Sequence, residues 1–301
     1  MGRGRRQPGP HDSPQKPGLI VLDKRLLVVS AQGGVGKSAV SAGLAQLATR
    51  QGKRVLVIDM GESAGLAAHL GVRDLVFDPI EVRPDLHAMR LIRSDSLIEY
   101  LTLQLSLKGL NRFSRVARAF DALATAAPAV REIISIGKVL WEVRERKWDL
   151  VIADAPPTGQ IGSYLRAPRS ISELVPTGRI ERQAAWMGET LRDPDSTEMV
   201  IVSLAEELPT TETRQTLAWL ETNELVPEPM VITNRVVPEL ATAAKGRGPV
   251  RDAAIHHRSV YVEQQKWLSE LPPHVELPYL FGLLTPTEVA ARLSDALEES
   301  L

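Results

Sequence analysis

Residues 25–38 read Arg-Leu-Leu-Val-Val-Ser-Ala-Gln-Gly-Gly-Val-Gly-Lys-Ser. The apolar run in this stretch predicts a buried strand, and apolar residues recur at helical spacing from Ala39 to Leu47. The glycines between them let successive backbone N–H groups face an anion, and the helix that follows adds the positive end of its dipole. A glycine-rich hairpin or plain turn is the alternative, but neither explains a strand before the loop and a helix after it. The stretch therefore predicts a phosphate-binding loop.

Two side chains at the end of this loop suit a nucleoside triphosphate. Lys37 is expected to reach the β- and γ-phosphates, and the Ser38 hydroxyl is expected to ligate Mg²⁺. With ordinary glycine usage, a chance Gly-Gly-x-Gly-Lys-Ser in a chain of this length has odds on the order of one in a thousand. The sequence therefore predicts a nucleotide-binding protein.

The composition excludes several other classes of function. The formal net charge of -1 argues against a general binder of nucleic acid or membrane surfaces. The chain has no cysteine, so it holds no disulfide, iron–sulfur cluster or cysteine zinc site. No stretch approaches the length of a membrane span. His256 and His257 fall in a predicted loop, where they are expected on the solvated surface.

The first 18 residues differ in composition from the rest of the chain. They are basic and rich in proline and glycine, which predicts a disordered tail; a weak contact arm for anionic partners is the alternative. They lack the apolar middle of a secretory signal, so we expect a cytoplasmic protein. Residues 19–301 show no internal repeat and no linker, and they are expected to form one domain.

Strand-like and helical runs alternate along this domain, which is typical of an α/β fold with a parallel sheet covered on both faces. A helical insertion is expected over residues 95–146, where an apolar stripe fits packing in the core better than an exposed groove for a client helix. Residues 236–254 carry few apolar anchors and are expected to form a mobile loop. Further strands are expected at 53–59, 87–92, 150–154, 199–204, 230–234 and 275–278, and helices at 181–191, 210–222, 257–271 and 287–299.

Polar residues end three of the predicted strands, at the sheet edge where open parallel sheets bind ligands. Asp59 is suited to orient or deprotonate an attacking water, and Asp154 to hold the Mg²⁺ shell. Either acid alone would be interpreted as a helix cap or a solvated turn residue. Asn234 can offer a donor and an acceptor to a purine edge. The Pro-Pro-Thr-Gly sequence at 156–159 suits a loop that senses the γ-phosphate.

Together these motifs resemble the deviant-Walker, dimeric ATPases of the arsenite-pump and tail-anchored-protein-targeting family, which are relatives of the MinD/ParA and nitrogenase iron-protein group. The resemblance extends over residues 25–300 and is closest to the actinobacterial branch of the family. The matching pieces are Gln32-Gly-Gly-Val-Gly-Lys-Ser38, Asp59 with residues 66–71 behind it, Asp154-Ala-Pro-Pro-Thr-Gly159, Glu212-Thr213 after Pro209, Thr233-Asn234-Arg235, and Leu277-Pro-Tyr-Leu280.

This resemblance implies a P-loop NTPase with a deviant Walker A loop, about eight mostly parallel strands, and ATP and Mg²⁺ as cofactors. ATP would be sandwiched in a homodimer or in a heterodimer with a paralogous ATPase. The nucleotide cycle would drive a partner or client, including a membrane protein, in anion transport or protein targeting. Asp59 and Lys37 would be catalytic, and Ser38 and Asp154 would hold the metal. The nucleotide-binding residues would be Gly33, Gly34, Val35, Gly36, Lys37, Ser38, Ala39, Asn234 and Pro278.

The chain also departs from the family pattern. The family loop commonly has a lysine at the position of Gln32, and that lysine reaches the partner's nucleotide across the dimer. Gln32 carries no charge, which predicts slow intrinsic hydrolysis or a need for a lysine supplied by a paralogue. The usual Pro-Ala-His after the water-orienting acid is replaced by Met60-Gly-Glu62. Arsenite sensing and a zinc-clasped dimer both use cysteines, so neither is expected.

The sequence therefore leaves three candidate functions for this chain. The first is a dimeric Mg²⁺-dependent ATPase, favoured by Lys37, Ser38, Asp59 and Asp154. The second is an ATP-binding regulatory subunit whose paralogue supplies catalysis, favoured by Gln32. The third, a small-molecule kinase, fits less well because no arginine-rich lid is found.

Overall fold

The fold is built around one eight-stranded sheet. The computed structural model describes residues 19–61, 65–105, 128–240 and 247–301. The strands lie in the order β3-β4-β2-β5-β1-β6-β7-β8, and all neighbours are parallel except β3 and β4. This confirms the predicted α/β fold with its mostly parallel sheet. The strands are β1 Leu26–Ala31, β2 Val55–Asp59, β3 Ile80–Arg83, β4 Leu86–Arg90, β5 Leu150–Asp154, β6 Thr197–Leu204, β7 Met230–Val236 and β8 His274–Pro278.

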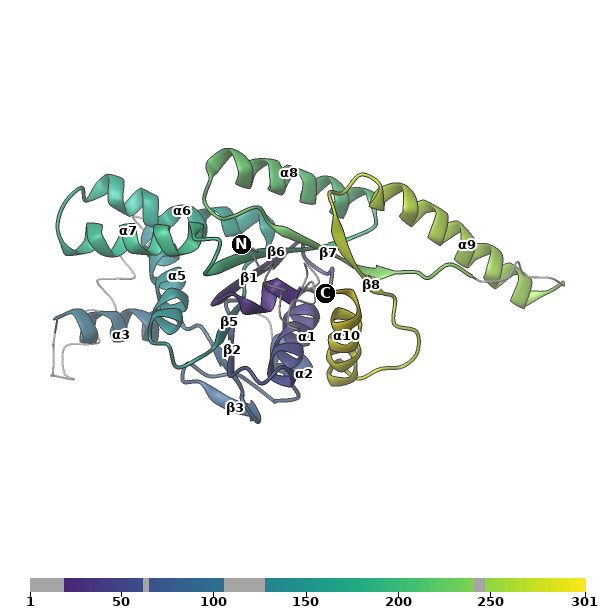
Figure 1. Ribbon diagram of the computed structural model, residues 1–301, viewed down its shortest axis with the longest axis horizontal. Coiled ribbons are helices and arrows are strands. Elements are labelled where there is room, and N and C mark those ends of the chain that lie inside the picture. Colours follow the sequence, from purple (N-terminus) through teal and green to yellow (C-terminus); the bar gives the residue numbers. More distant parts are fainter. Residues whose placement is uncertain (1–18, 62–64, 106–127, 241–246) are drawn as a thin grey trace, which may run out of the picture.

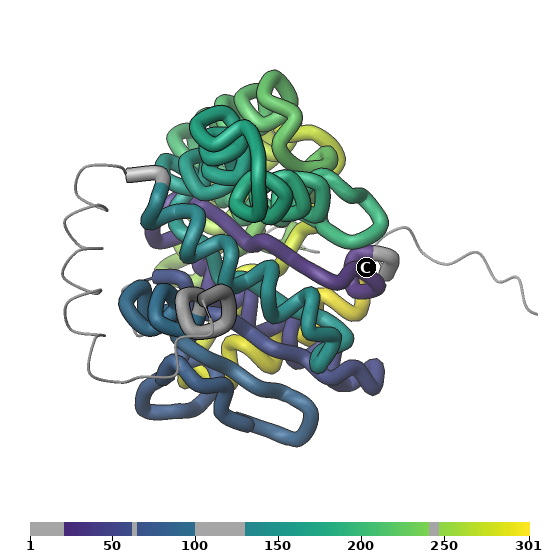
Figure 2. Tube along the Cα trace, turned by 90° about the vertical axis from the view of Figure 1, so that its left-hand side faces the viewer, coloured from purple at the N-terminus to yellow at the C-terminus, as the bar shows by residue number. Residues whose placement is uncertain are grey.

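Helices cover the sheet in two layers, as Figure 1 shows. Helices α1, α2 and α10 pack together on one face, whereas α5, α6, α7 and α8 lie on the other. Figure 2 gives the view turned by 90°, with the green helices of residues 158–223 at the top and the blue segment of residues 65–90 at the bottom. The helices are η1 Leu19–Asp23, α1 Lys37–Arg50, α2 Gly65–Leu70, α3 Arg93–Leu105, α5 Pro128–Arg144, α6 Thr158–Leu174, α7 Arg179–Arg192, α8 Glu207–Asn223, α9 Pro249–Leu268 and α10 Pro286–Ser300.

Strand β1 explains why the sheet can carry two hydrophobic cores. All six of its residues are buried. Because side chains alternate along a strand, Leu27 and Val29 join the core under α1 and α10, whereas Leu26 and Val28 join the core under α5 and α6. A strand covered on both faces reads as a continuous apolar run, which is the pattern found before the glycine-rich loop. The end of β1, where that loop begins, is thereby fixed by packing from both sides.

Most of the predicted elements are present, with two corrections. Residues 249–254 were predicted as loop but belong to α9, which begins at Pro249 after Gly248 and carries His256 and His257. The Thr158–Gly159 pair was predicted as a flexible loop but forms the first turn of α6. Proline at the start of a helix is favourable because its fixed φ suits the first turn and its missing N–H costs nothing there.

Some predictions fall outside the described residues. These are the tail over 1–18, the middle of the helical insertion over 106–127, Glu62, and residues 241–246 of the predicted loop. At either end of the insertion, α3 and α5 are helical as predicted and contact each other. Strand β3, an antiparallel strand at the edge of the sheet, was not predicted. Within the described ranges, no helix has the length and apolar character needed to cross a membrane.

Candidate nucleotide site

The glycine-rich loop connects β1 to α1 at the carboxyl edge of the sheet. Gly34 and Gly36 have φ angles of 86° and 95°, which are strained for residues with a Cβ. Gly36 has a second constraint, because a Cβ there would lie 2.5 Å from Asn234 Nδ2. The strand predicted to end at Asn234 continues to Val236 as β7, so Asn234 lies within the strand and not at its end. Asn234 donates from Nδ2 to the Val35 carbonyl over 2.9 Å. The loop is thus braced by a strand two positions away in the sheet.

Asp154 is the centre of the polar contacts below this loop. It ends β5 and is 1% exposed. Lys37 Nζ lies 2.6 Å from its Oδ1, and the Ser38 hydroxyl donates to its Oδ2 over 2.7 Å. The Ser41 hydroxyl donates to Oδ1 over 2.9 Å from the next turn of α1. A carboxylate with three donors is fixed in orientation and costs less to bury, because its charge is paired and its lone pairs are used.

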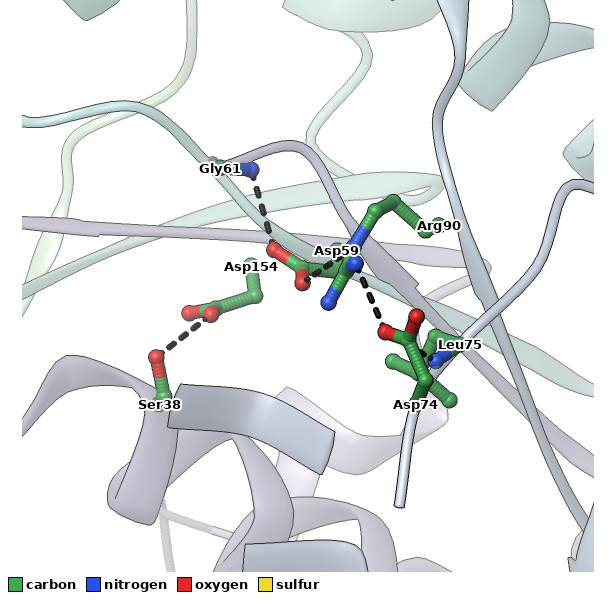
Figure 3. A network of polar contacts seen from close by, with 7 residues as sticks. All are labelled: Ser38, Asp59, Gly61, Asp74, Leu75, Arg90 and Asp154. Carbon is green, nitrogen blue, oxygen red and sulfur yellow. Dashed lines mark hydrogen bonds and ion pairs between the residues drawn. The ribbon is translucent and has the colours of Figure 1, made fainter. Parts of the chain in front are cut away.

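Asp59 lies beside Asp154, since the two residues are register partners on β2 and β5. It is 2% exposed, its Oδ1 accepts the Gly61 N–H over 3.0 Å, and its Oδ2 lies 3.4 Å from Arg90 Nε (Figure 3). Burial raises the pKa of Asp59 above its usual range. The neighbouring Asp154 carboxylate adds to this rise, and the contacts with Gly61 and Arg90 oppose it.

A separate cavity of about 370 Å³ opens on the other side of the loop. Its volume is in the range of small-molecule pockets. Four residues predicted to bind nucleotide line it together: Gly36, Ala39, Asn234 and Pro278. The remaining walls come from α2, the end of β7, the segment that follows β8, and α10, with His69, Arg235, Tyr279, Leu280, Val289 and Leu293.

The sequence also matches the model of a known protein family. Residues 24–187, more than half of the chain, match the family model described as anion-transporting ATPase. The chain belongs to the anion-transporting ATPase family. The match includes the loop, Asp59 and Asp154, and it ends in α7.

Individual members of the anion-transporting ATPase family also align with the chain. ATPase BagA of Mycobacterium tuberculosis is 29% identical over 239 residues, which cover 74% of this chain and 70% of that protein. ATPase get3 of Neurospora crassa is 28% identical over 52% of this chain and 47% of its own length. ATPase ASNA1 homolog 1 of Paramecium tetraurelia is 29% identical over 47% of this chain and 43% of its own length.

The oxygen groups around Asp154 fit the magnesium that an anion-transporting ATPase would use. A serine hydroxyl and carboxylate oxygens are hard ligands of the kind that Mg²⁺ prefers, and Mg²⁺ at nucleotide sites completes its shell with phosphate oxygens and water. Among the described residues, no cluster of three or more His, Cys, Asp or Glu could hold a metal ion without such help. The oxygen groups of Ser38 and Asp154 fit Mg²⁺ on the chemistry of the ligands.

Most of the predicted site residues lie close together in this member of the anion-transporting ATPase family, and they form two groups. Lys37, Ser38 and Asp154 form one group, beside Asp59, and Asn234 and Pro278 belong to the other. Gln32 is partly exposed at the start of the loop.

Three residues of the site were missed: Ser41, Arg90 and Asp74. Ser41 follows Ser38 by one helical turn, so its spacing could have placed it on the same face of α1. No comparable sequence signal exists for the contact of Arg90 with Asp59, because it depends on β4 lying next to β2.

Proposed function

We propose that this chain is a Mg²⁺-dependent ATPase. The observation that carries the proposal is the convergence of Lys37, Ser38 and Ser41 on Asp154 directly beneath the glycine-rich loop. A lysine and a serine hydroxyl at these positions of such a loop are suited to the β- and γ-phosphates and to the metal. The neighbouring cavity at Asn234 and Pro278 would receive the base of the same nucleotide.

The residues of the site would act in sequence when ATP binds. The Lys37 side chain is 17% exposed, so its ammonium can leave Asp154 for the phosphates without a change in the fold. Asp154 and the Ser38 hydroxyl would then hold Mg²⁺, which when bound would supply positive charge to offset the negative charge of the phosphates. Asp59 would orient the attacking water, because it is the second carboxylate at the same edge of the sheet.

The assembly of this ATPase is also a proposal. Dimeric relatives of this type sandwich the nucleotide between subunits, and the position of Gln32 is where the family lysine reaches across. The partly exposed side chain of Gln32 supports a contact with a second subunit, in a homodimer or with a paralogous ATPase. ATP binding and ADP release would then change the subunit geometry and drive a partner or client, as in anion transport or protein targeting.

A second candidate function is an ATP-binding regulatory subunit with weak catalysis of its own. The specific observation in its favour is also Gln32, because trans-acting cations contribute about 10³-fold or more to phosphoryl transfer in related enzymes. In this case the chain would bind ATP fully, and a paralogue would provide the missing charge.

Phosphate release by the purified chain with Mg²⁺ and ATP tests the first proposal. The Lys37→Ala variant is the control for contaminating activity. Release that depends on Lys37 supports an ATPase, and release equal to that of the variant contradicts it. The same assay repeated with a paralogous subunit separates the two candidates, since only a regulatory subunit requires the partner for measurable turnover.

A further inference from the structure

Three charged side chains stand in a row at the carboxyl edge of the sheet. Asp154 on β5 is the register partner of Asp59 on β2, and Asp59 is the register partner of Arg90 on β4. Register partners on neighbouring parallel strands place their side chains on the same side of the sheet. The row therefore places an arginine next to the acid proposed to orient water.

Arg90 joins Asp59 to a residue at the surface. Its Nε lies 3.4 Å from Asp59 Oδ2, and its Nη1 lies 2.7 Å from Asp74 Oδ1 (Figure 3). The same Asp74 oxygen accepts the Leu75 N–H over 2.9 Å, which fixes the acid in the segment between α2 and β3. The Arg90 N–H donates to the Val76 carbonyl over 2.7 Å, so this segment is bound to β4 by backbone as well.

One guanidinium nitrogen of Arg90 is left over. Nη2 is buried and has no hydrogen-bond partner among the residues that the structure describes, while the side chain as a whole is 22% exposed. A buried donor without a partner costs free energy, so an arginine with a purely structural role would be expected to use both of its terminal nitrogens. The arrangement fits a residue whose Nε and Nη1 hold Asp59 and Asp74, with Nη2 left without a partner in the described part of the chain.

Asp59 needs such a neighbour for two reasons. It is almost fully buried, and it lies beside a second buried carboxylate, Asp154, so two negative charges share one edge of the sheet. A water-orienting acid must also keep one direction. The Gly61 N–H holds Oδ1, and Arg90 is the side chain that contacts Oδ2.

We propose that Arg90 is a positioning residue for ATP hydrolysis, which holds the Asp59 carboxylate in its working orientation and is itself held by Asp74. This rests on the proposed function, in which Asp59 orients the attacking water. Arg90 acts through Asp59 and does not bind the nucleotide. Its loss therefore affects the rate of the chemical step and leaves ATP affinity unchanged.

The test measures kcat, KM and the Kd of a fluorescent ATP analogue for the full chain with Mg²⁺. Arg90→Met is expected to lower kcat about 10- to 100-fold, which is the usual cost of misplacing a reacting group, with Kd within about twofold of the wild type. Arg90→Lys restores part of this loss, because it keeps the charge and loses only the forked contact. Arg214→Met is the matched control, because Arg214 is an exposed arginine on α8, outside the row. Its Nη1 lies 2.8 Å from Glu270 Oε2, so the variant also removes an ion pair.

A second variant avoids any difficulty with folding. Asp74 is 62% exposed, so Asp74→Asn is expected to fold normally and to lower kcat by about threefold through the weaker hold on Arg90. In an Asp59→Asn background, adding Arg90→Met is expected to cause no further fall in kcat, since the acid that Arg90 positions is already removed.

Unchanged kcat in both Arg90→Met and Asp74→Asn overturns the proposal, as does a loss that appears mainly in Kd. A full additional loss in the Asp59→Asn background also overturns it, because Arg90 would then act independently of Asp59. Failure of the proposed function looks different: the wild type itself then releases no phosphate above the Lys37→Ala variant, which overturns both proposals at once.

Discussion

The two carboxylates at the site, Asp154 and Asp59, lie side by side but are supported in different ways. Within the described part of the chain, the donors to the Asp154 carboxylate all come from α1, the helix that follows the loop: Lys37, Ser38 and Ser41. Asp59 accepts a hydrogen bond from the Gly61 backbone N–H and contacts Arg90 Nε over 3.4 Å. Arg90, the last residue of β4, also contacts Asp74 at the surface. The Asp154 carboxylate is thus held by one element, α1, whereas Asp59 is held by its own backbone neighbour and by a row of contacts that leads through Arg90 to Asp74.

This difference suggests a division of labour. The unit around Asp154 contains the groups that a nucleoside triphosphate and its metal require, so we assign binding to it. Asp59 carries fewer donors and keeps acceptor capacity, which suits an acid that must take hold of a water molecule. Substitutions at the two acids and at the residues around them test this contrast.

The largest effect is expected at Asp154. Asp154→Asn removes the charge that pairs with Lys37 and the oxygen expected on Mg²⁺, so we expect the affinity for Mg²⁺-ATP to fall about 100-fold. Titration with a fluorescent ATP analogue measures it. Asp149→Asn is a matched control, because Asp149 precedes the same strand and caps only the Arg54 N–H, at the opposite edge of the sheet. Equal affinities for Asp154→Asn and Asp149→Asn would remove Asp154 from the binding unit.

Next in size is the effect of closing the space at Gly36. Gly36→Ala places a Cβ 2.5 Å from Asn234 Nδ2 at a φ of 95°, and we expect the free energy of unfolding to fall by about 2 kcal/mol. Gly33→Ala is the control, because a Cβ there meets nothing within 4 Å. Urea denaturation of both variants measures the difference. Equal stability would mean that neither the positive φ nor the close approach of Asn234 constrains position 36.

How much of this site follows from the sequence depends on whether both partners belong to recognisable motifs, and not on their separation in the chain. Ser38 and Asp154 were expected to meet, because both were assigned to Mg²⁺, and they do. The ion pair of Lys37 with Asp154 was not predicted, because Lys37 was assigned to the phosphates. The brace from Asn234 to Val35 could not be predicted: the amide was expected to face a purine, and that role stays a prediction while the amide is seen to hold the loop. The contact of Arg90 with Asp59 was missed because it depends on the order of strands in the sheet, which a local sequence pattern does not indicate.

The fold shows the same limit. The continuous apolar run of β1 predicted a strand buried on both faces, and β1 is fully buried. The acids that end β2 and β5 were predicted at the carboxyl edge of the sheet, where they lie. The start of α9 was placed too late, although Gly248 followed by Pro249 is itself a sequence signal for a helix start. Strand β3 has an alternating pattern of partly buried and exposed residues over only four positions, too short to stand out.

Gln32 tests whether the chemical step lacks a cation. Gln32→Lys restores the charge that the family commonly has, and we expect turnover to rise about tenfold or more in an assembled dimer. Gln32→Met is the control for a change in side chain without charge, and it should give no rise. Steady-state phosphate release at saturating ATP measures both. No rise with lysine would count against a missing trans-acting cation as the limit on turnover.

The smallest effect is on stability at Asp59. Burial raises the pKa of Asp59, so its protonated form is favoured by folding, and the free energy of unfolding decreases as pH rises from the ordinary aspartate pKa through the raised one. Asp59→Asn removes the buried charge, and we expect a gain of about 1 kcal/mol at pH 7 that fades toward pH 3. Thermal unfolding at several pH values measures it. Lower stability of the variant at neutral pH would show that the ionised carboxylate stabilises the fold.

The most direct measurement of the division between binding and hydrolysis is made on Asp59→Asn itself. Its affinity for Mg²⁺-ATP and its phosphate release are determined in one preparation, beside the wild type and Lys37→Ala. We predict wild-type affinity for Asp59→Asn with phosphate release lowered about 100-fold, whereas Lys37→Ala loses both. Wild-type phosphate release from Asp59→Asn, or loss of its ATP binding, would contradict the assignment of Asp59 to the chemical step.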